Sequence, residues 1–276
     1  MIAATHRPFF TRSAASLALL LPGLAGAAPA SHECLIEPYQ RLEIRSPVTG
    51  LIKSVTVERG SLVQKGQVLL ELDYGIEAAL LAAARYRSQM QGEVRAAEAR
   101  SRYADLKQER LKVLNKDNLV SAQDRDEAIA SAQVAESDLL AARDNRELAA
   151  LEVKRLTETL EQRKLRSPIN GIVTDRLQHN GELAQSGETG KPILRLAQTH
   201  PLRVELVLPV ARLGSIKLGE VATIVPEPPL AGRWSAAVKQ IDRVVDAASG
   251  TFRVLLELPN PDGAIAAGVR CSAAFR

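Results

Sequence analysis

A repeated octapeptide constrains the fold of this chain more than any other feature of its sequence. Arg45–Ile52 (RSPVTGLI) returns as Arg166–Val173 (RSPINGIV), and each copy ends in an apolar run, Val68–Leu72 or Pro192–Leu196. Alternating apolar residues between turn glycines predict short strands. A copy of roughly 30 residues is too short to bury a core alone, so the two copies are predicted to pack face to face as halves of one β-sandwich. The glycines that mark the repeat are Gly50, Gly60, Gly66, Gly171 and Gly181.

The segment between the copies has a helical pattern. From Gly75 to Lys164 there is no proline, and apolar or small residues recur at alternating steps of four and three. That 3.5-residue period is typical of a coiled-coil seam. The seam positions predicted for the first arm are Ile76, Leu80, Ala83, Met90, Val94, Ala97, Ser101, Ala104 and Leu111, with Arg87 as a break. Those of the second arm are Ala128, Ala132, Ala135, Leu139, Ala142, Ala149, Val153, Leu156 and Leu160, with Arg146 as a break.

The two arms are predicted to fold back on each other. Asn115–Asn118 interrupts the pattern about halfway, and Ser121 with Asp124 resembles a capped helix start. Two arms of ~40 residues around a central turn would form an antiparallel hairpin ~60 Å long, at 1.5 Å per residue. Its alanine-rich seam predicts a stiff hairpin of modest stability.

After Gln198 the pattern changes to alternation with period two. Leu202–Leu208, Val221–Val225 and Phe252–Leu258 read as short strands between glycines and prolines. Such strands predict a small antiparallel barrel, which Leu35 and Ile36 would close from the N-terminal side. The chain is therefore predicted to be a mixed α and β, elongated, multidomain protein. Its expected parts are a signal peptide at residues 1–30, a sandwich at 43–73 plus 165–198, a hairpin at 74–164, and a barrel at 33–42 plus 199–276.

The first thirty residues are predicted to be a cleaved secretory signal. Arg7 and Arg12 precede the apolar Ala14–Gly26, and small residues follow. The apolar run is shorter than the ~20 residues that a spanning helix needs, and a retained anchor is the alternative. Removing both arginines lowers the formal charge from +4 to about +2. With no basic stripe interleaved with aromatics, that charge gives no case for nucleic-acid binding.

Two cysteines, Cys34 and Cys271, lie near the two ends of the mature chain. Secretion permits a disulfide between them. If their strand-like segments are neighbours, the bond closes nearly the whole chain, and chain-entropy arguments then give an upper figure on the order of 5 kcal/mol. Two buried free thiols are the alternative.

The duplicated motif with a coiled coil between its copies resembles the membrane fusion proteins, also called HlyD-type periplasmic adaptors. The matching segments are Arg45–Gly50, Val57–Gly60 leading into Val63–Leu69, the returning Arg166–Gly171, and Ala267–Arg270 as the closing strand of the barrel. The resemblance covers almost all of the mature chain. It implies a lipoyl-like β-sandwich split by an antiparallel α-helical coiled-coil hairpin and followed by a β-barrel, reused without a cofactor.

A finer resemblance lies at the hairpin turn. Adaptors that dock onto outer-membrane channels of the TolC type share the pattern Arg-Leu, two residues, Leu, six residues, Ser. This chain has Arg110, Leu111, Leu114 and Ser121 at those spacings. The resemblance implies that the leucines pack between helices of the channel, while Arg110 and Ser121 donate hydrogen bonds. Alternatively, both leucines finish the hairpin's own seam and Arg110 is solvated.

The resemblance implies a periplasmic adaptor rather than an enzyme. Such a protein links an inner-membrane transporter, of the RND class first and an ATP-driven ABC type second, to the outer-membrane channel, and it self-associates into rings of three or six. The family usually continues past its barrel into a membrane-proximal domain, whereas this sequence ends at Arg276. The barrel and lipoyl-like domains are therefore expected to meet the transporter. Hinges are expected at Asp73–Gly75, Arg163–Arg166 and Gln198–His200.

Three rival functions fit the sequence less well than the adaptor does. A lipoyl-type carrier needs a lysine at the exposed turn, where this chain has Tyr74. The sequence contains no HxxH spacing, nucleophile elbow or phosphate loop that would indicate an enzyme or a metal site. Its four histidines are His6, His32, His179 and His200. Of these, His179 and His200 could meet between sandwich and barrel. A purely structural coiled-coil scaffold leaves the split repeat and the barrel without purpose.

Overall fold

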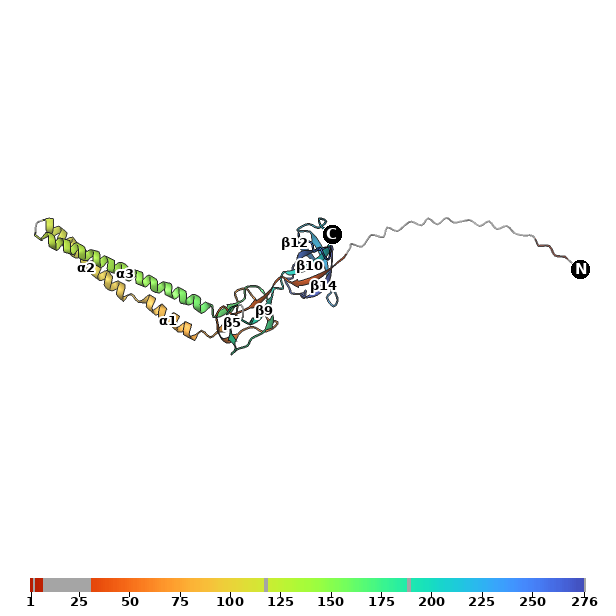
Figure 1. Cartoon of the computed structure of the whole chain (residues 1–276), viewed down its shortest axis with the longest axis horizontal. Coiled ribbons are helices and arrows are strands. Elements are labelled where there is room, and N and C mark those ends of the chain that lie inside the picture. Colours follow the sequence, from red (N-terminus) through yellow and green to blue (C-terminus); the bar gives the residue numbers. More distant parts are fainter. Residues whose placement is uncertain (2, 7–30, 117–118, 188–189, 276) are drawn as a thin grey trace.

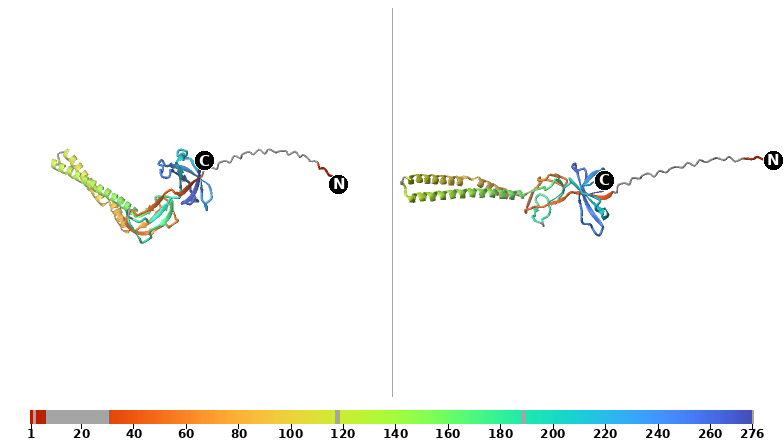
Figure 2. Two further views of the ribbon diagram at one scale, coloured as in Figure 1. Left: turned by 45° about the vertical axis from the view of Figure 1, so that its right-hand side comes forward. Right: turned by 90° about the horizontal axis from the view of Figure 1, so that it is seen from above.

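Three bodies follow one another along an elongated molecule. The structure is a computed structural model that describes residues 1, 3–6, 31–116, 119–187 and 190–275, so the expected signal peptide falls mostly outside the described residues. The helical hairpin forms one end, a β-sandwich the middle and a β-barrel the other end (Figure 1). Two further views show the same order, with the chain bending at the sandwich (Figure 2).

The two copies of the repeat interleave instead of packing as separate halves. One sheet has the order β2-β9-β7-β4 and the other β6-β5-β3-β8, so each takes two strands from each copy. The expectation that one copy packs face to face on the other is therefore wrong. The first strand of each copy pairs with the last strand of the other, β2 with β9 and β6 with β5. The strands are β2 (Arg41–Ile44), β3 (Gly50–Val55), β4 (Leu62–Val63), β5 (Val68–Leu72), β6 (Lys164–Arg166), β7 (Gly171–Arg176), β8 (Leu183–Ala184) and β9 (Leu194–Ala197).

Equivalent residues of the two copies make equivalent contacts across the sandwich. The backbone N–H of Gly60 donates to the carbonyl of Val173, and that of Gly181, its counterpart, donates to the carbonyl of Ile52, both at 2.8 Å. Both glycines have φ near +90°, as does Gly66, which a side chain would disfavour. Gly171 is required for a different reason, since a Cβ there would lie 2.2 Å from a backbone oxygen of β9; at Gly50 it would meet the Arg163 side chain.

The sandwich core draws on both sheets. Its fully buried side chains include Ile52 of β3, Leu69, Leu70 and Leu72 around β5, and Leu194 and Leu196 of β9. This shared core lies between the sheets, so residues that alternate with core residues along each strand point away from it on two outer faces.

The hairpin has one continuous arm and one broken arm. The second arm is the single helix α3 (Ala122–Glu161), whereas the first consists of α1 (Gly75–Gln89) and α2 (Gly92–Lys116). The break follows from extended backbone at Met90, with ψ of 126°, and it is visible in Figure 1. The two arms are nearly equal in length, as expected, but the regular seam expected along the first arm is interrupted at this break.

The break also changes which residues of α1 face the partner helix. The predicted seam holds along α2 and α3, where Val94, Ala97 and Ser101 pack toward Ala132 and Ala142 as buried residues. In α1 the buried residues are Leu81 and Ala84, one position later than predicted. Ile76 and Leu80 are exposed instead. The phase of α2 cannot be continued backwards because the non-helical residues at the break reset it.

The C-terminal region forms a closed six-stranded barrel, as the alternating segments predict. Its order is β1-β10-β13-β12-β11-β14, closed by β1 against β14. The inward residues form one aliphatic core, which includes Ile36, Leu202, Leu206 and Val254, each fully buried. The strands are β1 (His32–Pro38), β10 (Leu202–Pro209), β11 (Val221–Pro226), β12 (Trp234–Ile241), β13 (Thr251–Leu258) and β14 (Val269–Phe275), with a 3-10 turn η1 (Val210–Arg212) after β10.

The boundary between barrel and sandwich lies earlier than expected. β2 pairs with β9 of the sandwich, so residues 41 and 42 belong to the sandwich and not to the barrel. Two chain segments cross the junction and are tied together, because Tyr39 donates to the carbonyl of Gln198 and Gln198 donates to that of Gln40, each at 3.0 Å. The connection at Gln198, which the sequence predicts as a hinge, thus consists of two chain segments that are hydrogen-bonded to each other.

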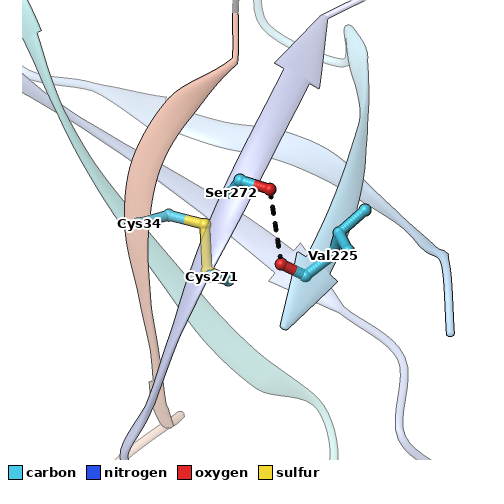
Figure 3. The surroundings of a disulfide bond; sticks show 4 residues. All are labelled: Cys34, Val225, Cys271 and Ser272. Atoms are coloured by element: carbon cyan, nitrogen blue, oxygen red, sulfur yellow. Dashed lines mark hydrogen bonds between the residues drawn. A yellow bond between two sulfur atoms is a disulfide. The ribbon is translucent and has the colours of Figure 1, made fainter. Parts of the chain in front are cut away.

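Cys34 and Cys271 are direct neighbours in the barrel wall. They are register partners of β1 and β14, and in the structure they form a disulfide bond that spans 237 positions of sequence (Figure 3). Both side chains point into the barrel core. On the far side of β14, Ser272 donates to the carbonyl of Val225 in β11 at 3.5 Å, also drawn in Figure 3. The disulfide therefore joins β1 and β14, the two strands that close the barrel.

Candidate functional site

The residues of the predicted docking pattern gather at the hairpin end farthest from the barrel (Figure 1). Arg110, Leu111 and Leu114 lie in the last turns of α2, and Ser121 directly precedes α3. Arg110 is exposed and Leu111 is half-buried. Leu111 thus continues the seam of α2, in agreement with the alternative that the leucines belong to the hairpin's own seam. Leu114 lies about one helical turn after Leu111.

Ser121 is the N-cap of α3. Its hydroxyl accepts a hydrogen bond from the backbone N–H of Asp124 at 3.1 Å and donates to the Asp124 carboxylate at 2.6 Å. This is the capped restart that the sequence predicts. The hydroxyl proton is engaged within the cap, so a structural role accounts for Ser121 without a partner.

The tip exposes more apolar surface than the sequence pattern identifies. Leu114 is 38% exposed, Val113 52% and Leu119 69%. The backbone N–H of Leu119 donates to the carbonyl of Leu114 at 3.1 Å, which holds the two leucines on one turn. Val113 and Leu119 were not singled out from the sequence. The sequence feature that could have identified them is that both are apolar at positions outside the seam between the two helices.

The base of the hairpin is braced against the sandwich. Arg163 forms an ion pair with Glu77 of α1 and also donates to the carbonyl of Thr49 at 3.2 Å, so it joins both arms to the start of β3. Both partners of the ion pair are mostly buried. Arg166 pairs with Glu161 at 3.0 Å and donates to the carbonyl of Gly66 at 3.1 Å. The segment expected as a hinge at Arg163–Arg166 is therefore held by charged contacts from both ends.

The other candidate residues remain separate in the structure. His179 lies 3.3 Å from the Glu182 carboxylate within its own turn, whereas His200 accepts from the backbone N–H of Asn260 at 3.1 Å. Within the described ranges, no three His, Cys, Asp or Glu side chains lie close enough to hold a metal ion. Nor does any described helix combine the length and apolarity needed to cross a bilayer.

Proteins of similar sequence include multidrug resistance proteins and an uncharacterised protein. No protein-family model matches the chain. The multidrug resistance protein MdtA of Pectobacterium carotovorum is 26% identical over 236 residues, which are 80% of this chain and 52% of that protein. An uncharacterised protein of Haemophilus influenzae is 27% identical over 232 residues, 83% of this chain and 52% of its own length. The chain thus spans about half the length of the curated relatives it matches.

Solved structures share the fold of this chain. The crystal structure of MacA from Actinobacillus actinomycetemcomitans superposes with a TM-score of 0.74 at 20% identity, covering 90% of this chain and 78% of that one. A membrane fusion protein from Streptococcus pneumoniae gives a TM-score of 0.63 at 14% identity, covering 90% and 98%. The chain therefore has the fold of these two structures and is similar in sequence to multidrug resistance proteins, and both likenesses agree with the resemblance to membrane fusion proteins that its motifs carry.

Proposed function

We propose that this protein is a periplasmic adaptor that links an inner-membrane efflux transporter to an outer-membrane channel of the TolC type. The observation that carries the proposal is the apolar hairpin tip, held far from the barrel by the long helices. An exposed apolar cluster at the end of a rigid arm is suited to packing between the helices of another protein. Leu114, Val113 and Leu119 would supply the apolar contacts, and Arg110 the polar rim.

The opposite end of the molecule would meet the transporter. The barrel end away from the hairpin has exposed apolar side chains in the loops after β10 and β12, including Val210, Leu213 and Val244. An RND-class transporter is the first choice and an ATP-driven exporter the alternative. Because the relatives include multidrug resistance proteins, small toxic compounds are the expected cargo. The protein would act in the periplasm after cleavage of its signal peptide.

The proposed mechanism is mechanical and conductive rather than chemical. Three or six copies side by side would form a ring that seals the export path. The contacts at Arg163 and Arg166 would pass movement of the sandwich on to the hairpin, since they join the helices to both β3 and the β4–β5 turn. Weak contacts at each tip would suffice, because several tips bind one channel together.

A lipoyl-type carrier and a coiled-coil scaffold are the alternative functions. The repeated motif of the sandwich resembles that of lipoyl domains, but Tyr74 stands where a carrier would have its lysine. Helix α1 begins directly after it, and the ammonium group of Lys53 lies 4.4 Å from the centre of its ring. A tyrosine has no amine to form the amide bond that holds a lipoyl or biotinyl group, so Tyr74 cannot serve as a swinging arm. An intact mass carrying a lipoyl or biotinyl adduct would favour the carrier.

The first test is crosslinking in cells from a photoreactive residue at position 114. Capture of an outer-membrane channel is expected, whereas capture of only the same chain or an inner-membrane protein would contradict the tip assignment. The companion variant is Leu114→Asp, which should abolish export and leave the melting temperature within about 1 °C, because exposed positions contribute little to stability. Leu140→Asp is the matched control and should export normally, because Leu140 is also an exposed leucine, at 60% against 38% for Leu114, and lies midway along α3.

A further inference from the structure

The first helix of the hairpin carries two apolar stripes, and only one of them is covered. The sequence LLAAA that begins at Leu80 places a leucine and an alanine three positions apart twice, as Leu80 with Ala83 and as Leu81 with Ala84. Leu81 and Ala84 are buried against α3. Leu80 is 52% exposed, and Ile76, one turn before it, is 75% exposed. We call Leu81 with Ala84 the covered stripe, and Ile76 with Leu80 and Ala83 the open stripe.

The open stripe continues the seam of α2. Counted back from Val94, a buried seam residue of α2, alternating steps of four and three reach Met90, Arg87 and then the three residues of the open stripe. This is the 3.5-residue period of a coiled-coil seam. In the structure, extended backbone at Met90 shifts the helical phase by one position, so that α3 meets the covered stripe instead. One position of an α-helix corresponds to a rotation of about 100°.

The helices are not packed together where the two phases meet. A groove of about 250 Å³ lies between α1 and α3 at the break, and its lining includes Ala84, Arg87, Ala149 and Glu152. Arg87 and Glu152 border the same space with opposite charges. A continuous first arm would bring Arg87 to the seam, where Glu152 is a carboxylate available to pair with it.

We propose that the first arm has a second conformation, in which α1 and α2 join into one continuous helix and α1 turns by one position, so that the open stripe packs against α3. Each conformation buries one leucine and one alanine of the LLAAA sequence, so these side chains favour neither. The rotated arm would also bury Ile76, but it would lose the ion pair between Glu77 and Arg163. Two packings of similar free energy form a two-state element. The inference goes beyond the adaptor role and does not depend on which transporter or channel is bound.

The ion pair at the base of the hairpin connects this rotation to the sandwich. Glu77 follows Ile76 directly, so a turn that brings Ile76 to α3 takes Glu77 away from Arg163. Arg163 also donates to the carbonyl of Thr49, just before β3, at 3.2 Å. Movement of the sandwich that separates Arg163 from Glu77 would therefore favour the continuous helix. Joining α1 to α2 would in turn straighten the arm that carries the tip.

Substitutions at Gly92 can favour either conformation. The backbone N–H of Arg95 donates to the carbonyl of Gln91 at 2.9 Å, so Gln91 is the N-cap of α2 and Gly92 is its first helical residue. Proline is tolerated at the first position of a helix but breaks a helix interior, so Gly92→Pro should hold the arm in its present conformation. Gly92→Ala should favour the continuous helix, because glycine is the weaker helix former in a helix interior. A Cβ at position 92 meets no atom within 4 Å.

Disulfide formation between introduced cysteines, under a mild oxidant, distinguishes the two conformations in the full chain purified from the periplasm. Ala84→Cys with Val153→Cys reports the present conformation, since both residues belong to the contact of α1 with α3. Ala83→Cys with Val153→Cys reports the rotated one. The native cysteines are joined to each other and do not interfere. The ratio of the second crosslinking rate to the first should be at least about tenfold higher in Gly92→Ala than in Gly92→Pro, because proline is far less favourable than alanine in a helix interior.

A cysteine pair whose contact both conformations share is the control. Ala97→Cys with Ala142→Cys joins α2 to α3 beyond the break, and its rate should be the same in both Gly92 variants. Circular dichroism checks that each variant is folded. Equal ratios in Gly92→Pro and Gly92→Ala would overturn the second conformation. An Ala83→Cys product that joins two chains would also overturn it, because another copy would then cover the open stripe.

Removing the ion pair tests the connection to the sandwich. Glu77→Ala should raise the crosslinking ratio in a chain that keeps Gly92, because the present conformation alone uses the pair with Arg163. An unchanged ratio would overturn this connection. Each of these contrary results would leave the proposed adaptor role as it stands, since that role rests on the apolar tip.

Discussion

The barrel and the hairpin bury their cores with different kinds of side chain. The barrel interior consists largely of leucine, isoleucine and valine with no exposed surface, such as Leu206 and Val254. The hairpin seam is built mostly from alanine, as at Ala97, Ala132 and Ala142. A fully buried leucine stabilises a fold by about 1.5–3 kcal/mol, and each buried methyl group by about 0.8 kcal/mol. The barrel therefore derives far more stability from each buried residue than the hairpin does.

This difference separates the two tasks of the molecule. Small seam residues let the helices of the hairpin approach closely, which keeps a long arm thin and straight at the cost of little buried area per turn. The apolar side chains at the tip are not used in the seam and remain exposed, where a partner could bind them. The barrel, closed on itself and joined by a disulfide, is the stable base from which that arm projects. Stability is expected to fall from barrel to tip.

Removing the disulfide should have the largest effect on this gradient. Cys34→Ser with Cys271→Ser releases the two strands that close the barrel and reopens a loop of 237 positions. The barrel should lose up to about 5 kcal/mol of unfolding free energy, the upper figure from chain entropy. Trp234, the single tryptophan, lies in β12, so its fluorescence in urea reports barrel unfolding while circular dichroism reports the helices.

The two signals together decide the outcome of that experiment. A large shift in the fluorescence midpoint with little change in the helical signal would support separate stabilities. Mapping of the unmodified chain that finds two free thiols would contradict the bond, and equal shifts in both signals would contradict the separation of barrel from hairpin.

A single cavity in the barrel core should have the next largest effect. Leu206 is fully buried in β10, and Leu206→Ala should cost about 3 kcal/mol, from lost transfer free energy and from the cavity that remains. The neighbouring Val207 is 53% exposed on the outer face, and Val207→Ala should change the fluorescence midpoint little. Equal midpoints for the two variants would mean that the barrel interior is not packed as described.

A glycine in the hairpin seam should have a smaller and more local effect. Ala132→Gly should cost about 2 kcal/mol, since glycine lowers helix propensity by about 1 kcal/mol and a buried methyl contributes about 0.8 kcal/mol. Ala130→Gly, exposed on the same helix, should show the propensity loss alone. Hydrogen–deuterium exchange resolved by segment measures both, and faster exchange confined to α2 and α3 is expected. Spread of the effect into the barrel would contradict independent stabilities.

The predictable parts of the fold are those whose pattern repeats without interruption. The α2–α3 seam and strands β10 and β13 follow a strict period, so their buried residues can be read from sequence. The α1 seam cannot, because Met90 turns the backbone to an extended conformation and resets the helical phase. Strand β12 was missed because a bulge between Val238 and Gln240 breaks its alternation.

The candidate site was only partly predictable for a similar reason. Leu114 and Ser121 follow from a spaced pattern, and the cap at Ser121 follows from Asp124 three residues later. Leu119 and Val113 belong to no period and became visible only through their exposure. The sandwich at the base of the hairpin depends on strand pairings between residues more than 100 positions apart, which local sequence does not specify.

Acidification should have the smallest effect on stability. It distinguishes charge pairs that join different strands from charge pairs within one helix. Hydrogen bonds from Arg45 and then from Arg195 hold the pKa of the Glu43 carboxyl below its ordinary value near 4.5 and tie β2 to β9. A hydrogen bond from Arg155, three residues away on α3, lowers the pKa of Glu152 in the same direction. A carboxyl whose pKa is lowered by folding contributes stability above its ordinary pKa, and that stability is lost as the pH falls through the lowered value.

Acidification below pH 4.5 should therefore lower the amide protection factors, which compare exchange with the intrinsic rate at the same pH, in β2 and β9 and also in α3. Glu43→Gln should reduce the pH dependence in the two strands, whereas Glu152→Gln should reduce it only in the turns of α3 around the substitution, because its partner lies on the same helix. Both carboxylates are solvent-exposed, so the changes should be small and should shrink further in high salt. Loss of pH dependence throughout α3 in Glu152→Gln would mean that the hairpin unfolds as one unit. The lower stability of the hairpin relative to the barrel would then be explained by the small side chains of the hairpin seam alone.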